Sequence, residues 1–144
     1  MKKLLSYIFF LSVIILAFSA CKDDDDEPAV VNLPVNYANL SGEWQLVSWR
    51  GEQLPEGVYF KIDFDRRDHI FTIRQNLNSM YEQQLIGSYS IELQDDDETY
   101  LLSGSYAYGK GDWEHSYIIS SISVDGTLSL VAADDASNTA ILKK

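Results

Sequence analysis

The sequence predicts an all-β fold of about eight antiparallel strands, arranged as an up-and-down barrel or as a sandwich. From Gly42 onward, short runs rich in Val, Ile, Tyr, Phe and Thr alternate with turn residues every eight to twelve positions. After residue 41, no window longer than two turns shows helical periodicity. A chain of 144 residues has room for one such domain and not for two.

The strands are expected where these runs stand between turn residues. Asp125-Gly126 separates two apolar runs and is typical of a tight hairpin, because both residues tolerate positive φ. One turn of helix is expected over residues 36–40, before the first strand. The predicted strands are Glu43–Trp49, Val58–Phe64, Ile70–Gln75, Tyr81–Leu93, Tyr100–Tyr106, His115–Ser123, Thr127–Ala132 and Thr139–Leu142.

Alternation along these runs assigns one face of each strand to the core. In the run Val58–Phe64, every second residue is apolar, whereas Tyr59, Lys61 and Asp63 point the other way. The predicted core collects the apolar faces of several strands: Val58, Phe60, Ile62, Phe64, Phe71, Ile73, Leu85, Tyr89, Ile91, Leu128 and Leu130.

The first twenty residues have the layout of a secretory signal peptide. Lys2 and Lys3 give a basic start, an apolar stretch follows over residues 4–18, and Ser19-Ala20 are small residues at the cleavage position. The apolar stretch is shorter than the roughly 20 residues that a membrane span needs. A buried or membrane-anchoring helix is the alternative interpretation of residues 1–20.

Cys21 is the only cysteine in the chain, so it has no partner for a disulfide. A reactive thiolate would need a neighbouring base and an ordered pocket, yet a polar run follows this residue. Residues 17–21 resemble a bacterial lipoprotein signal, from which they depart at Phe18, where the pattern prefers Leu, Val or Ile. The resemblance implies a cleaved signal and acyl chains on Cys21, which would attach the protein to a membrane.

The residues after Cys21 are expected to form an acidic flexible tether over 21–36. Asp23–Glu27 is a run of like charges that repel one another, and a calcium site is the alternative, although four adjacent Asp residues cannot all face one ion. Lys22 followed by acids resembles the surface-export signal of Bacteroidetes lipoproteins. That resemblance implies an outer-membrane protein that faces outward from the cell.

The charge of the chain argues against nucleic acid as a partner. The full chain carries a net charge of −11. Cleavage of residues 1–20 would remove two lysines and leave 9 basic and 22 acidic residues, a net charge of −13. Proteins that bind nucleic acid neutralise phosphates with patches of Lys and Arg, and the few basic residues here are scattered.

A Gly-x-aromatic pattern occurs three times, beginning at Gly42, Gly87 and Gly104. Glycine in a strand marks a bend or a close backbone approach, and an aromatic residue two positions later faces the same side and can cover the bare glycine. This geometry suits the sharp coiling of a small closed barrel. The pattern therefore predicts a barrel. It places these glycines and aromatic residues at the corners of the barrel, where they serve its curvature and do not bind a ligand.

Residues 40–48, which read Leu-Ser-Gly-Glu-Trp-Gln-Leu-Val-Ser, resemble the first strand of the lipocalin-like (calycin-type) lipoproteins of Bacteroidetes. The stretches 102–106 and 111–117 resemble the same group, and the resemblance spans residues 38–144. It implies a lipocalin-like barrel over residues 37–144. Longer lipocalins carry an Arg near the C-terminus that packs on the Gly-x-Trp tryptophan, and the last strand here offers only Lys143 and Lys144.

No motif with a catalytic mechanism is present in the sequence. The two histidines, His69 and His115, do not form a zinc-binding helix pattern. No Gly-x-Ser-x-Gly elbow occurs, and Gly109-Lys110-Gly111 lacks the rest of a phosphate loop. The sequence therefore predicts a protein that is not an enzyme and that uses no metal or cofactor.

Binding is the favoured class of function. Small eight-stranded barrels either hold one small ligand or fill with side chains. Aromatic residues at a barrel mouth can stack on sugar rings or apolar ligands, and the predicted ligand rim is Trp49, Arg50, Tyr106, Tyr108 and Trp113. Packing in a cross-strand aromatic ladder is the alternative role for these residues. We expect a surface-anchored protein that binds a small apolar or glycan ligand, or alternatively a filled barrel that binds or inhibits another protein.

Overall fold

Three of the predicted strands have their predicted bounds in the computed structural model, which describes residues 28–144. Cys21, the predicted signal peptide and the acidic run lie outside the described residues. The elements are β1 (Asn32–Leu33), α2 (Tyr37–Leu40), β2 (Gly42–Trp49), β3 (Glu52–Gln53), β4 (Phe60–Asp65), β5 (Ile70–Gln75), β6 (Gln83–Leu93), β7 (Tyr100–Tyr106), β8 (Tyr117–Ser123), β9 (Thr127–Ala132) and β10 (Asp135–Lys143).

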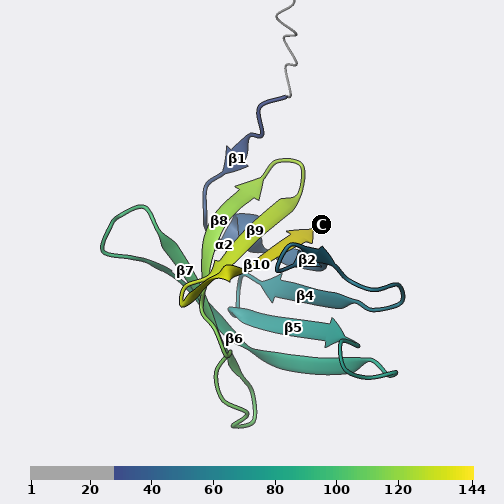
Figure 1. Ribbon diagram of the computed structural model, residues 1–144. Coiled ribbons are helices and arrows are strands. Elements are labelled where there is room, and N and C mark those ends of the chain that lie inside the picture. The colour runs from purple at the N-terminus through teal and green to yellow at the C-terminus, as the bar shows by residue number, and fades with distance from the viewer. Residues whose placement is uncertain (1–27) are drawn as a thin grey trace, which may run out of the picture.

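The eight long strands close into an antiparallel barrel (Figure 1). Each strand from β4 to β9 pairs with the next one along the chain, β2 pairs with β4, and β10 returns to pair with β2. The connections are therefore up-and-down, and the barrel prediction is confirmed over the sandwich. Among residues 28–144, no helix is long and apolar enough to span a membrane.

Two short strands lie outside the barrel ring. β3 forms a hairpin with the end of β2 through Arg50-Gly51, which both have positive φ, at 53° and 80°. β1 pairs with Ile122 and Ser123 of β8. The prediction placed residues 32 and 33 in the tether and missed β3, because two-residue strands carry no alternation that a sequence pattern can detect.

The core fills the barrel with the inward faces that alternation predicted. Trp44, Phe64 and Phe71 are among the largest fully buried side chains. Seven of the eleven predicted core residues are buried. Phe60, Leu85 and Ile91 are partly buried against the core, and Val58 is half-buried at its edge.

One end of the barrel, the helix end, carries α2, the β4–β5 turn, the β8–β9 turn and the C-terminus. Asn36 caps α2, because its Oδ1 accepts a hydrogen bond from the Asn39 backbone N–H at 2.8 Å. Leu40 of α2 is fully buried, and its carbonyl oxygen accepts a 2.6 Å hydrogen bond from Trp44 Nε1. Lys144 Nζ lies 4.6 Å from the centre of the Trp44 ring. The C-terminal lysine thus takes the packing position that the sequence resemblance assigns to an arginine.

Close packing requires glycine at two of the three Gly-x-aromatic positions, Gly87 and Gly104. The aromatic rings that pack on these glycines are not the ones that the pattern predicted. A Cβ on Gly87 would lie 2.6 Å from the Phe71 ring, and one on Gly104 would lie 2.2 Å from the Trp113 ring. The aromatic cover at each glycine therefore comes from another segment and not from the residue two positions later. This cross-strand cover lets the strands bend sharply.

Candidate functional site

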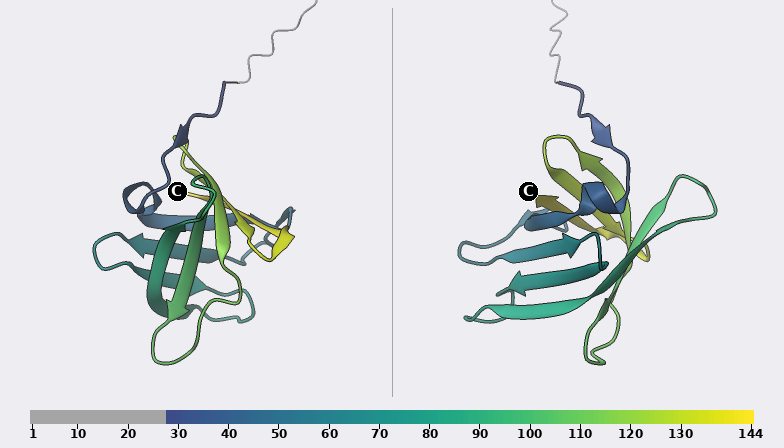
Figure 2. Two further views of the ribbon diagram at one scale, coloured as in Figure 1. Left: turned by 90° about the vertical axis from the view of Figure 1, so that its left-hand side faces the viewer. Right: turned by 180° about the vertical axis from the view of Figure 1, so that it is seen from behind.

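The end opposite α2, here called the aromatic end, carries all five residues of the predicted ligand rim. Strand direction places four connections there: residues 50–51, 76–82, 107–116 and 133–134. Figures 1 and 2 show the β7–β8 loop on the opposite side of the barrel from the N-terminal segment. The five residues share this end, but they divide into an outward group and an inward group.

Trp49 and Arg50 form the outward group. Trp49 is 47% exposed, and its Nε1 donates a 2.8 Å hydrogen bond to Asn138 Oδ1. Arg50 donates to Asp135 at 2.9 Å and to the Ser137 hydroxyl at 3.1 Å. Its guanidinium carbon lies 5.7 Å from the centre of the Trp49 ring. We call Trp49, Arg50, Asp135 and Ser137 the Trp49 platform.

Asn138 holds this platform from inside the barrel wall. It is 1% exposed, although it is polar, and burial of an amide is tolerated when its groups are hydrogen-bonded. The Trp49 indole N–H donates to its Oδ1 at 2.8 Å and so satisfies the buried amide oxygen. The sequence prediction missed Asn138, because the stretch 134–138 resembles a loop and the bend in β10 that buries this side chain is not visible in composition.

The carboxylate of the platform is ionised at neutral pH. The hydroxyl and backbone N–H of Ser137 donate to Asp135 and lower the pKa of its carboxyl group, with a further contribution from Arg50. The platform therefore presents an exposed indole beside a guanidinium, a carboxylate and a hydroxyl. These groups offer both hydrogen-bond donors and acceptors.

Trp113 and Tyr106 form the inward group. The Trp113 ring covers Gly104 and lies 5.0 Å from the Phe71 ring, centre to centre, while Tyr106 packs on Phe71 from 5.7 Å. Tyr117 meets Trp113 edge-on at 6.5 Å. Burial raises the pKa of the Tyr106 and Tyr117 hydroxyls, so both rings are neutral at pH 7. Packing, the alternative role for these rings, accounts for their position.

The indole nitrogen of Trp113 is buried without an acceptor among the described residues. Leaving a buried donor unsatisfied costs about 1–3 kcal/mol. The Trp113 side chain is partly buried against the core, and the burial of its apolar surface, at about 25 cal/mol per Å², offsets this cost. The closed position of Trp113 is therefore favoured, but by less than its packing alone suggests.

Tyr108 and His115 complete the β7–β8 loop. Tyr108 is 93% exposed and has a φ of 60°, so its ring lies in solvent. His115 Nδ1 lies 2.8 Å and 3.0 Å from the two carboxylate oxygens of Asp134. This pair ties the loop to the β9–β10 turn. Within residues 28–144, no cluster of three or more His, Cys, Asp or Glu side chains could hold a metal ion.

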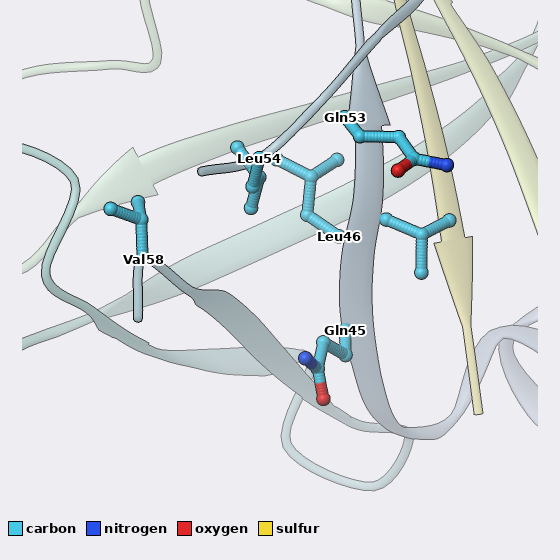
Figure 3. A pocket seen from close by; sticks show the side chains of 6 residues that line it. Gln45, Leu46, Gln53, Leu54 and Val58 are labelled. Carbon is cyan, nitrogen blue, oxygen red and sulfur yellow. The ribbon is translucent and has the colours of Figure 1, made fainter. Parts of the chain in front are cut away.

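A hollow of about 330 Å³ lies in the barrel wall beside β2 (Figure 3). It opens where β2 and β4 separate, since their pairing covers only Gly42–Gln45 of β2. No residue of the predicted rim lines it. Its lining residues are Gln45, Leu46, Val47, Gln53, Leu54 and Val58.

Comparison of the chain with protein-family models, curated proteins and solved structures found no match. The sequence resemblance to lipocalin-like lipoproteins therefore stays a prediction, and the up-and-down barrel stands on the strand pairing alone.

Proposed function

We propose that the protein is a non-catalytic glycan-binding lipoprotein of the outer membrane that holds a sugar ring on the Trp49 platform. One observation carries the proposal: an exposed tryptophan is fixed from behind by a buried asparagine. Rings fixed before binding lose little conformational freedom when a ligand arrives. An exposed indole otherwise leaves apolar area in water with no compensation.

The filled interior favours a sugar on the surface over an apolar ligand inside the barrel. Trp44 and Phe71 occupy the space that a ligand in the barrel axis would need. Sugar rings have an apolar face that stacks on an aromatic ring and hydroxyls that need polar partners. The Trp49 platform supplies the indole together with Arg50, Asp135 and Ser137.

The predicted anchor is compatible with this use. The chain enters the barrel through β1, which pairs with β8 at the helix end. Acyl chains on Cys21 would then hold the protein from the end opposite the Trp49 platform and leave the platform facing away from the membrane. Mass spectrometry of native protein should show an acylated N-terminal cysteine, and Cys21→Ser should release the protein from membranes.

An array of neutral and acidic oligosaccharides tests the glycan proposal. The wild-type protein should bind at least one member, and Trp49→Ala should weaken that binding by about tenfold or more, because stacking contributes about 1 kcal/mol beyond area burial. Trp49→Phe should retain part of the affinity. Leu93→Ala, which removes an apolar residue of similar exposure (49%) at the helix end, is the matched control. Equal binding by wild type and Trp49→Ala on every glycan would refute the proposal.

A protein partner is the second candidate, and the β5–β6 loop favours it. Met80 and Tyr81 are 94% and 81% exposed, side by side at the aromatic end. Exposed apolar residues in a group can mark protein contacts. If this candidate holds, a Met80→Ser/Tyr81→Ser double variant should lose partner binding on the cell surface while Trp49→Ala keeps it.

A further inference from the structure

The position of the Trp113 ring is a small aromatic compartment at the aromatic end, here called the Trp113 seat. Gly104 forms its floor with bare backbone, and Phe71 and Tyr117 stand beside it. All of these groups are uncharged at neutral pH. The seat is filled by the chain's own indole, which leaves its N–H without an acceptor among residues 28–144.

Two backbone hydrogen bonds hold the chain at Trp113, so an opening of the seat would come from the side chain. The Trp113 backbone N–H donates to the Gly104 carbonyl at 2.8 Å, and Tyr106 N–H donates to the Gly111 carbonyl at 2.8 Å. Rotation about χ1 would carry the indole from the seat to solvent without breaking these bonds. Water would then satisfy the indole N–H, which offsets part of the packing lost from the closed position.

We propose that the Trp113 seat is a second binding site, which takes an uncharged aromatic ring of about indole size when the Trp113 side chain rotates out. The Trp113 ring lies so close to the Gly104 backbone that a Cβ on Gly104 would be only 2.2 Å from it. A ligand in the same position must therefore be a flat ring. Phe71 and Tyr117 provide aromatic contacts to such a ring. Phe71, Tyr117 and the Gly104 backbone carry no charge. The carboxylates of Glu114 and Asp134 lie near Tyr117, so an anionic ligand is disfavoured.

The test uses N-phenyl-1-naphthylamine, an uncharged fluorescent probe. A minor open state of about 0.1–10% would lower the apparent affinity of the wild type by tenfold or more relative to the open form. Trp113→Ala should therefore bind the probe at least about tenfold more tightly than wild type does. Gly104→Ala should displace the indole and also raise binding, by less, because the new methyl group occupies the floor of the seat.

Two measurements keep the test independent of variant folding. Titration of indole into wild-type protein should shift the NMR resonance of the Trp113 indole N–H and leave that of Trp44 in place. Val124→Ala, at an exposed position of the helix end, should bind the probe as wild type does. The proposal is overturned if folded Trp113→Ala binds the probe no better than wild type, or if millimolar indole leaves the Trp113 resonance unshifted. Glycan binding by the Trp49 platform is independent of either result.

Discussion

Each end of this barrel is closed by a tryptophan, and the two are held differently. At the helix end, Trp44 is 1% exposed, its N–H donates to the Leu40 carbonyl, and Lys144 lies over its ring. At the aromatic end, Trp113 packs on Gly104 and Phe71 but leaves its N–H without an acceptor among the described residues. A tryptophan therefore closes each end. The indole N–H has an acceptor at the helix end and has none among the described residues at the aromatic end.

The difference indicates which end is free to change. A hydrogen bond fixes the position of the Trp44 indole. The Trp113 indole is held only by packing on Gly104 and its neighbours, and another aromatic ring could make the same contacts. Cores in which every polar group is satisfied specify one arrangement. The aromatic end combines this unsatisfied indole with the exposed Trp49 and Tyr108, while the helix end is covered by α2.

The largest expected effect is the loss of Trp44. Trp44→Ala should lower the free energy of unfolding by about 3–5 kcal/mol, because it empties a site in the core and leaves the Leu40 carbonyl without its donor. Trp113→Ala should cost about 2 kcal/mol less than Trp44→Ala, since it also removes a buried donor that has no partner. Urea unfolding followed by circular dichroism measures both. Equal losses would contradict the distinction between the two ends.

Alanine at the two buried glycines gives the next largest effect. A Cβ on Gly87 would lie 2.1 Å from the Ser105 backbone oxygen and 2.6 Å from the Phe71 ring, so strands must separate. For a Cβ on Gly104, the three nearest atoms all belong to the Trp113 ring, a side chain that can give way by rotation where backbone cannot. Gly87→Ala should destabilise the protein by about 3 kcal/mol and Gly104→Ala by about 1 kcal/mol. The reverse order in thermal unfolding would show that Trp113 is fixed and not movable.

The fold was largely predictable from the sequence because alternation and turn residues are local signals. In the strand Ile70–Gln75, the apolar Phe71 and Ile73 alternate with polar residues, and the strand has its predicted bounds. β10 was predicted to begin at Thr139 and begins at Asp135. Its first residues are mostly polar and span a break in register, where only Asp135 pairs with β9 before the ladder resumes at Thr139. Their own strand propensity is low, so no local signal marks them.

The candidate site was predictable only in its composition. The aromatic residues of the rim were found, because their types and loop positions are visible in the sequence. Their division into an outward Trp49 and an inward Trp113 was not visible, since it depends on contacts to Asn138 and Gly104, which lie 89 and 9 positions away in the chain. Long-range contacts of this kind leave no periodic signal.

A pH titration at the helix end tests an effect smaller than the losses expected at Trp44 and Gly87. Tyr89 is 4% exposed, and burial, followed by the charges around it, raises the pKa of its hydroxyl to about 12. The hydroxyl donates to the Asp65 carbonyl at 3.1 Å. An unfolded tyrosine ionises near pH 10, so the folded state holds its proton more tightly than the unfolded state does. The stability linked to Tyr89 is therefore complete below pH 10 and is lost as the pH rises toward 12.

Tyr89→Phe isolates this contribution from the general effect of alkali on the other tyrosines and lysines. Between pH 9 and pH 12, the wild type should lose about 2 kcal/mol more unfolding free energy than the variant does, because each pKa unit corresponds to about 1.4 kcal/mol. Urea unfolding at each pH, with tyrosine ionisation followed at the same time by absorbance, measures the difference. Parallel pH profiles for the two proteins would mean that the Tyr89 hydroxyl reaches water in the folded state, and the helix end would then be as open as the aromatic end.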